Sequence, residues 1–347
     1  MASTATCAVT CSDSEPTEFI IPDFVSDCRY PMQLNPHCDL VSRASEQWLC
    51  SEAHLVEPER TKYTSLLAGY FASSCYPDAD AFHLKVCADF LGWSFKLDDW
   101  LEIERSDVND AWGVRDCCLS AYRDPVNYQT ERYSAKMCKS YFARFKETGG
   151  PGCTERFIHA MDLWFISAAK EVDNRAKGHV DDVESYIELR RDLSGCKSCF
   201  ALIEFVNRID LPDEVVSHPV IMALEEATND FVSWSNDIFS YNMEQSHHST
   251  HNLVAVLMLD QGLNLQDAVD YCARLCNISL QRFEENRAII PSWGEEVDKQ
   301  VALYVQGLQN WITGPLQWSF VTARYFGKDV NIVKQDRTVK LIPKRPL

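Results

Sequence analysis

Residues 218–245 read HPVIMALEEATNDFVSWSNDIFSYNMEQ, and their apolar residues recur with the period of an α-helix. The same period is found in residues 82–100, 133–149, 155–178 and 264–290. Short breaks containing Pro, Gly or Asp separate these stretches, and the alternation typical of strands is scarce. The sequence therefore predicts a single all-α domain.

The two ends of the chain differ from this helical span. Residues 1–20 lack the basic and apolar regions of a secretion signal, so we expect a disordered leader and a cytoplasmic protein. Residues 328–347 carry clustered basic residues, and we expect a tail that is exposed or packs over an opening. The α domain is then predicted to cover residues 21–327.

The composition disfavours several classes of function. The 347 residues include 33 basic and 51 acidic ones, and the formal net charge of −18 argues against a nucleic-acid partner. An anionic small molecule is still compatible with this charge if metal ions stand between it and the carboxylates. No run approaches the roughly 18 apolar residues of a membrane span, so no integral membrane association is expected.

The cysteines and histidines do not form a recognisable zinc pattern. Fifteen cysteines are an odd number in a long chain, and we expect reduced thiols, many of them buried as small apolar groups. Cys196 and Cys199 have metal-ligand spacing, but no second pair accompanies them, so a zinc or redox site is disfavoured. His247, His248 and His251 follow the long helix directly and lack a clear fourth ligand.

Three polar residues in the quoted stretch are spaced four apart. Asn236, Ser240 and Glu244 fall within a narrow arc of one helix face and run over two turns. Amide, hydroxyl and carboxylate oxygens are ligands for a hard cation such as Mg²⁺. The alternative interpretation is a solvated polar stripe on an amphipathic helix.

A second acidic group lies in the sequence FKLDDWLEIE. Asp98, Asp99 and Glu102 close the predicted helix that begins near residue 82, and Asp98 and Glu102 share a face. Carboxylates at a helix C-terminus are electrostatically unfavourable, and a bound cation would offset that cost. Taken alone, however, acidic pairs are common on protein surfaces.

Two further elements offer donors for phosphate oxygens. Arg190 and Arg191 run into a break at Gly195, and Arg324 and Tyr325 lie near the predicted end of the last helix. The planar guanidinium fork matches phosphate geometry, and the break exposes backbone groups that a ligand can contact. The alternatives are ordinary salt bridges and a cation at a helix terminus.

The ordered set DDWLE (98–102), RRDLSG (190–195), NDIFSYNME (236–244) and RY (324–325) resembles the class I terpene synthases, especially the sesquiterpene synthases of basidiomycete fungi. The resemblance implies a helical bundle around a deep apolar cavity in which farnesyl diphosphate is ionised and the carbocation is cyclised. It also implies a cluster of three Mg²⁺ ions. The implied metal ligands are Asp98, Asp99, Glu102, Asn236, Ser240 and Glu244.

The resemblance also implies an arginine that senses diphosphate about 46 residues before the triad. Arg190 lies 236 − 190 = 46 residues before Asn236, and Arg191 lies 45 before it. We prefer Arg191, because Ser194 and Gly195 then fall where the family's linker and effector residues follow the sensor. Arg190, Arg324 and Tyr325 are the other expected diphosphate contacts.

One departure from the family pattern is Met243, where bacterial relatives often carry a basic residue. His247 or Lys96 could replace the contact that this residue would make. Monomer and homodimer are both compatible with the sequence, and turnover of C10 or C20 substrates stays open.

The cavity that shields the carbocation is expected to be lined by residues near Asp98 and by Trp318, which lies seven residues before Tyr325 and so on the same helix face. The alternative is ordinary core packing. Two other functions stay open: a chain-elongating prenyltransferase, whose relatives carry two DDxxD motifs, and a non-enzymatic helical scaffold. The lining residues expected besides Trp318 are Phe90, Leu91, Ser94 and Phe95.

Overall fold

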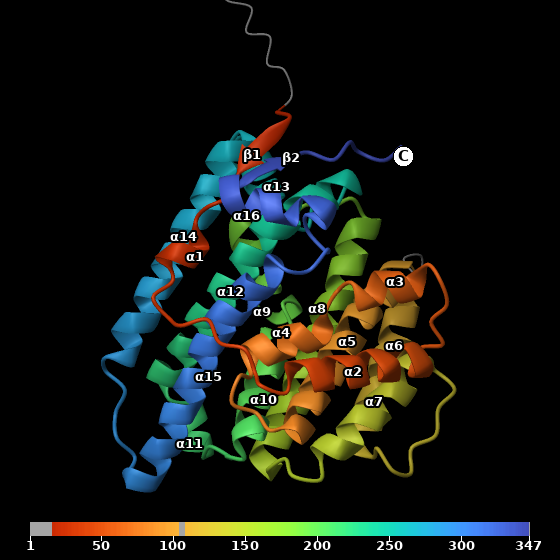
Figure 1. Cartoon of the computed structure of the whole chain (residues 1–347), viewed down its shortest axis with the longest axis vertical. Coiled ribbons are helices and arrows are strands. Elements are labelled where there is room, and N and C mark those ends of the chain that lie inside the picture. The colour runs from red at the N-terminus through yellow and green to blue at the C-terminus, as the bar shows by residue number, and fades with distance from the viewer. Residues whose placement is uncertain (1–15, 104–107, 347) are drawn as a thin grey trace, which may run out of the picture.

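The computed structural model describes residues 16–103 and 108–346, which fold into a bundle of α-helices (Figure 1). The longer helices are α2 (Cys38–Glu52), α5 (Ala81–Ile103), α6 (Val108–Arg123), α7 (Tyr133–Phe145), α8 (Pro151–Ala176), α9 (Val183–Leu193), α10 (Cys196–Asn207), α12 (Pro219–Ser246), α14 (Leu265–Arg287) and α15 (Glu295–Ser319). The shorter ones are α1 (Phe24–Asp27), α3 (Glu59–Thr64), α4 (Ala68–Cys75), α11 (Asp213–Val216), α13 (Leu253–Asp260), α16 (Val330–Asp336) and the 3₁₀ turn η1 (Gly327–Asp329). The predicted all-α class is confirmed.

Helix α12 is the stretch from which the fold was predicted, and its start follows from local chemistry. Pro219 occupies the first turn, where its missing N–H leaves no bond unmade. The His218 ring caps the helix by accepting a hydrogen bond from the Val220 backbone N–H at 3.3 Å. The helix packs against α14 and α15, so most of its length is buried (Figure 1).

Helix α5 forms the opposite side of the bundle core. It packs against α2, α4 and α7, and Trp93 and Leu97 have no exposed surface. Because α5 contacts helices on several sides, it is apolar around most of its circumference rather than along one stripe. In residues 16–103 and 108–346, the structure contains no helix with the length and apolarity to cross a bilayer.

A two-stranded antiparallel sheet joins the two ends of the described chain. β1 (Glu18–Ile20) pairs with β2 (Thr338–Lys340), and Phe19 lies opposite Val339 (Figure 1). The sequence had placed residues 18–20 in the leader and residues 338–340 in the tail, and it gave no sign of this pairing. Residues 1–15 of the expected leader lie outside the described residues.

Helices α4 and α15 approach each other closely at Gly314. A Cβ atom added to Gly314 would lie 2.6 Å from the Cys75 Sγ and 2.9 Å from the Cys75 backbone nitrogen. These separations are shorter than van der Waals contact, so only glycine fits at this position. The close packing brings Trp311 and Trp318 of α15 toward the aromatic residues of α4.

Candidate active site

A cavity of about 290 Å³ opens between the helices of the core. Its lining comes from α4, α5, α8, α9, α10, α12 and α15, and from the segments that follow α12 and α15. Part of the lining is aromatic and apolar, and part carries charged or hydrogen-bonding side chains. The second group contains several serines together with Asp98, Glu171, Arg175, Arg190, Asn236, Asp237, Glu244, His251, Arg324 and Tyr325.

The predicted triad on α12 faces this cavity. Asn236 and Glu244 line it, and Ser240 lies one turn from each, with 5% of its surface exposed. The Asn252 side chain donates a hydrogen bond to a Glu244 carboxylate oxygen at 2.9 Å. Asn236 and Glu244 therefore face the cavity rather than the outer surface, and the interpretation as a solvated surface stripe is wrong.

Asn236 connects three of the predicted motifs. Its Oδ1 accepts a hydrogen bond from an Arg190 guanidinium nitrogen at 3.0 Å, and its Nδ2 donates to the Tyr325 hydroxyl at 2.8 Å. Arg190 also donates to Asp237 at 2.9 and 3.1 Å. Burial lowers the pKa of Arg190, whereas Asp237, Tyr186 and Glu244 together raise it; the net shift is upward, so the guanidinium stays charged in the cavity.

The preference for Arg191 over Arg190 is contradicted by their positions. Arg191 donates two hydrogen bonds of 2.8 Å to Asp230 and lies 3.1 Å from Glu226, outside the cavity lining. Adjacent helical residues point about 100° apart, and the packing of α9 on α12 turns Arg190 inward. Spacing along the sequence could not distinguish the two.

The adjacent acidic residues at the end of α5 also point in different directions. Asp98 lines the cavity. Asp99 instead accepts hydrogen bonds from Lys62 at 2.6 Å and from the Tyr63 hydroxyl, both on α3, so its predicted place in the metal site is not supported. Glu102 belongs to α5 by its backbone, but its side chain lies outside the described residues.

Arg324 and Tyr325 both line the cavity, although not from a helix. Helix α15 ends at Ser319, so the prediction that Trp318 and Tyr325 share a helix face is wrong. Their rings still meet edge to face, with centroids 5.6 Å apart. The Arg324 guanidinium lies 5.0 Å from the centre of the Phe95 ring. Burial lowers the pKa of Arg324, whereas Tyr325, Asp98 and two further carboxylates together raise it, and the net shift is upward.

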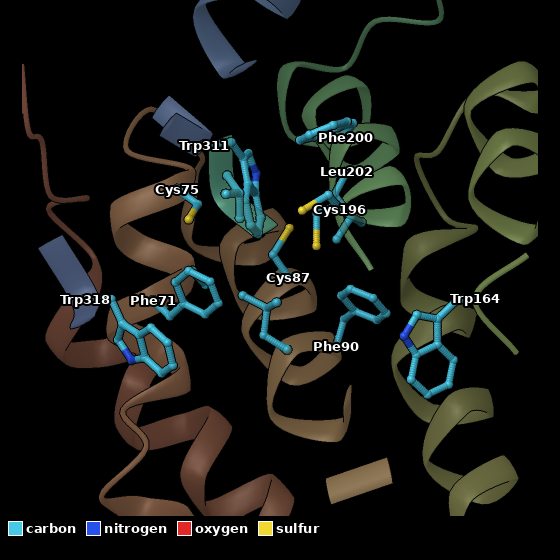
Figure 2. Close-up of a cluster of buried hydrophobic side chains, with 14 of the residues drawn as sticks. Phe71, Cys75, Cys87, Phe90, Trp164, Cys196, Phe200, Leu202, Trp311 and Trp318 are labelled. Atoms are coloured by element: carbon cyan, nitrogen blue, oxygen red, sulfur yellow. The ribbon is translucent and has the colours of Figure 1, made fainter. Parts of the chain in front are cut away.

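The apolar part of the cavity is built largely from aliphatic side chains and from rings on five helices, α4, α5, α8, α12 and α15. Figure 2 shows Phe71 of α4, Phe90 of α5, Trp164 of α8 and Trp318 of α15 directed toward a common space. Phe71 and Trp318 stack with centroids 4.4 Å apart. The predicted lining residues Phe90, Leu91, Ser94, Phe95 and Trp318 all lie on the cavity wall.

Neither replacement suggested for the missing basic residue reaches the cavity. Lys96 is 3% exposed, donates to Glu59 at 3.0 Å and packs 4.7 Å above the Tyr63 ring. His247 is exposed and does not belong to the cavity lining. Arg175 on α8 does line the cavity, close to Glu171 at 3.0 Å, and no sequence pattern singled it out.

Two other contributors were missed because they act through long-range contacts. Asp237 is almost fully buried and accepts hydrogen bonds from Arg190, from the Tyr186 hydroxyl at 2.7 Å and from the Leu253 backbone N–H at 3.1 Å. Asn252 joins the start of α13 to Glu244. The adjacency of Asp237 to Asn236 was the available signal in the sequence.

The cysteines and histidines considered as zinc ligands make separate contacts. Cys196 and Cys199 are buried free thiols on the cavity wall. His248 bonds to the backbone carbonyl of Arg345, whereas the His251 ring packs at a tilt of 51° against Tyr186, with centroids 4.9 Å apart. Burial, together with nearby arginines, lowers the pKa of His251 to about 3, so this ring is neutral.

Glu244 is a carboxylate of the site with a strongly raised pKa. Burial and the Asp237 carboxylate raise its pKa to about 7, although hydrogen bonds from Asn252 and Ser240 oppose the shift. A carboxylate held at this cost among oxygen donors is suited to a cation, which would offset both effects.

The comparisons with known proteins agree with this geometry. Residues 89–282 match the family model described as terpene synthase family 2, C-terminal metal binding. Sesquiterpene synthase 1 of Postia placenta is 45% identical over 336 residues, which are 96% of this chain and 98% of that protein. The alpha-muurolene synthase of Coprinopsis cinerea is 42% identical and covers 96% of this chain and 80% of its own length.

The solved structures add support for the fold. The crystal structure of a-eudesmol synthase superposes with a TM-score of 0.79 at 20% identity and covers 85% of this chain and 98% of its own. Identity at this level speaks to the fold alone, whereas the fungal relatives match over nearly the whole chain. The chain therefore belongs to the terpene synthase family, among the relatives of the fungal sesquiterpene synthases.

Proposed function

We propose that the protein binds farnesyl diphosphate with Mg²⁺, ionises it, cyclises the carbocation to a sesquiterpene and releases diphosphate. The observation that carries the proposal is Asn236, which joins Arg190 and Tyr325 at the wall of a cavity that is also lined by several Phe and Trp rings. The charged diphosphate of the substrate would meet the polar side chains there, and its apolar farnesyl group would meet the rings. The relatives' names supply the C15 class.

The residues present fit magnesium by their chemistry. Asn236, Ser240 and Glu244 offer amide, hydroxyl and carboxylate oxygens from one helix, and Asp98 offers a carboxylate from α5 on the same cavity. Hard oxygen donors are the set that Mg²⁺ prefers. When bound, Mg²⁺ would supply Lewis-acid neutralisation of the diphosphate charge, and we propose a cluster of three ions.

The protein's own side chains have three tasks in this reaction. Arg190, Arg324 and Tyr325 bind and orient the diphosphate oxygens through charge-assisted hydrogen bonds. Cleavage of the C–O bond leaves the electron pair on diphosphate and an allylic cation on the farnesyl group of the substrate. The rings of Phe71, Phe95 and Trp318 then exclude water and present π faces to that cation.

The test is incubation of the purified protein with farnesyl diphosphate and MgCl₂, followed by analysis of volatiles and free diphosphate. We expect a cyclic hydrocarbon, loss of activity with EDTA and recovery with Mg²⁺. Glu244→Gln should reduce turnover by at least about 100-fold, or about 2.7 kcal/mol in the barrier. The matched control is Glu295→Gln, an exposed carboxylate on α15 that should leave turnover unchanged.

Two outcomes would overturn the proposal. Conversion of farnesyl and isopentenyl diphosphates to longer prenyl diphosphates would assign the chain to elongation instead. If neither substrate is consumed by the folded protein with Mg²⁺ present, then the cavity is not catalytic for prenyl diphosphates.

A further inference from the structure

The last turn of α12 is held from behind by the C-terminal end of the chain. We call residues 338–346 the strap; it begins as β2, paired with β1, and then bonds to the end of α12 (Figure 1). Asn242 lies on the covered face and is 4% exposed. At 100° per residue it lies 200° from both Ser240 and Glu244, so the strap and the triad occupy opposite faces of the helix.

The Asn242 side chain makes one donor and one acceptor hydrogen bond to the strap, as a backbone amide in a neighbouring strand would. Its Nδ2 donates to the Lys340 carbonyl at 2.9 Å, and its Oδ1 accepts from the Ile342 backbone N–H at 2.8 Å. These two backbone groups lie on one side of an extended segment, and a carboxamide offers the complementary donor and acceptor. The pairing also fixes the orientation of the amide, because a flipped side chain would place oxygen against oxygen.

Three further bonds continue the attachment past the helix end. Gln245 donates to the Ile342 carbonyl at 2.7 Å. The Ser246 carbonyl, one of the last in α12 and so without a helical partner, accepts from the Arg345 backbone N–H at 2.9 Å. The Arg345 carbonyl lies 2.7 Å from Nε2 of His248. The strap therefore bonds both to the helix and to the loop behind it.

The loop formed by residues 247–252 leads from the strap to the metal-binding face. His248 has φ of 61°, a left-handed conformation that costs a non-glycine residue free energy and needs surrounding contacts to persist. Ser249 bonds through its backbone N–H to the Glu244 carbonyl at 3.1 Å. Asn252 ends the loop with its hydrogen bond to the Glu244 carboxylate.

We propose that Asn242 is a positioning residue that anchors the strap, fixes the turn carrying Glu244 and the loop 247–252, and thereby sets the affinity of the site for Mg²⁺ and diphosphate. The role assigned to Asn242 rests on the proposed function, since it concerns the same site. Asn242 contacts none of the reacting groups, so its effect falls on binding rather than on the chemical step.

The experiment measures thermal stabilisation by MgCl₂ with inorganic diphosphate, and the Mg²⁺ dependence of turnover. A ligand that binds only the folded state stabilises it by RT ln(1 + L/Kd), where L is the free ligand concentration, so the rise in melting temperature reports on the affinity. Asn242→Asp keeps the size of the side chain but sets a carboxylate oxygen against the Lys340 carbonyl. We expect the Mg²⁺ concentration for half-maximal stabilisation and for half-maximal turnover to rise at least tenfold, with kcat at saturating Mg²⁺ within about threefold of wild type.

The matched control is Asn35→Asp. Asn35 is 2% exposed and donates to the carbonyls of Tyr76 and Ala79 at 2.9 and 2.7 Å, so it loses the same kind of bond away from α12. It should lower the melting temperature without the tenfold change in Mg²⁺ requirement. An unchanged Mg²⁺ requirement in Asn242→Asp, or an equal change in both variants, would overturn the positioning role.

A milder variant covers the case in which Asn242→Asp does not fold. Gln245→Ala removes one bond to the strap and should raise the Mg²⁺ requirement about threefold; a value equal to wild type would overturn the inference. Thermal stabilisation of the wild-type protein distinguishes failure of the proposed function from failure of the role of Asn242. If it is not stabilised by Mg²⁺ and diphosphate at all, the proposed function fails, whereas normal wild-type stabilisation with unchanged variants defeats only the role of Asn242.

Discussion

The contrast between Arg190 and Arg191 shows that the direction of a side chain decides whether it reaches the cavity. Both guanidinium groups bond to a buried aspartate on α12, Arg190 to Asp237 and Arg191 to Asp230, and these aspartates are seven residues apart. They therefore make similar ion pairs on one helix face, but only Arg190 also reaches Asn236 and the cavity. The two ion pairs are chemically alike, but only the pair formed by Arg190 lies at the cavity.

This pairing gives a matched test. Arg190→Lys and Arg191→Lys each remove a planar fork from a buried carboxylate, so each should lower the unfolding free energy by roughly 1–3 kcal/mol. Only Arg190→Lys should also reduce turnover of farnesyl diphosphate, by about 100-fold or more. Urea unfolding and steady-state kinetics on both variants provide the comparison, and a greater loss of turnover in Arg191→Lys would reverse the assignment.

Glu225 gives a prediction about pH. Burial raises the pKa of this carboxyl to about 7, although the Tyr304 hydroxyl, which donates to it at 2.6 Å, opposes the shift. Glu204 raises the pKa further, while Lys197 and Arg156 lower it. Because the folded-state pKa lies above the unfolded value of about 4.5, the protonated form stabilises the fold, and this contribution is lost as the pH rises toward 7.

Glu225→Gln replaces the carboxyl with a neutral group that still accepts from Tyr304. We expect the variant to gain stability relative to wild type as the pH rises, by about 2 kcal/mol between pH 5 and pH 8. Urea denaturation at the two pH values measures the change. A difference that is the same at both would show that Glu225 does not titrate abnormally.

At the scale of elements, the close approach of α4 and α15 depends on Gly314. Gly314→Ala would place a methyl group against the Cys75 backbone, so the helices must separate, at a cost of about 2–3 kcal/mol. Gly92 in α5 is the control, because an added Cβ meets its nearest neighbour, Leu49, at an ordinary 3.5 Å. Gly92→Ala should be neutral or stabilising by up to about 1 kcal/mol, since alanine favours helix.

Thermal or urea unfolding of the two variants measures the difference. Equal stability of Gly314→Ala and Gly92→Ala would mean that α4 and α15 tolerate a wider separation than their packing indicates.

The helices were predictable from sequence and the sheet was not, for a physical reason. The segments 218–245 and 264–290 carry many turns of periodic apolar residues, each of which reports on the same buried face. β1 and β2 have three residues each and pair across nearly the whole chain, so neither carries a local signal. The same distinction explains why the triad was found from its spacing and Asn252 was not, since its bond to Glu244 depends on how a loop folds back.

At the scale of the whole molecule, the cysteines report on the integrity of the fold. Thirteen cysteines of the described chain are free, and ten of them are buried. Burial raises the pKa of Cys75, Cys87 and Cys199 well above the usual value, which suppresses the reactive thiolate. We infer that these thiols serve as small apolar groups of the core.

A thiol reagent such as dithiobisnitrobenzoate should therefore label the eight buried sites that do not line the cavity only when the protein unfolds. Peptide mass spectrometry after short labelling, with and without urea, assigns each site. The partly exposed Cys50 and Cys117 are the internal controls, expected to react at least tenfold faster in the native protein. Labelling of Cys87 or Cys276 at the same rate would show that the core opens locally.

The strap also has a consequence for the order in which the protein is made. Translation proceeds from the N-terminus, and domains generally fold as they emerge. Lys340, Ile342 and Arg345 are synthesised about a hundred residues after the end of α12, to which they bond. A growing chain can thus assemble its aromatic core while the turn bearing Glu244 still lacks its outer partners, and this turn is completed only when the ribosome has added residues 340–345.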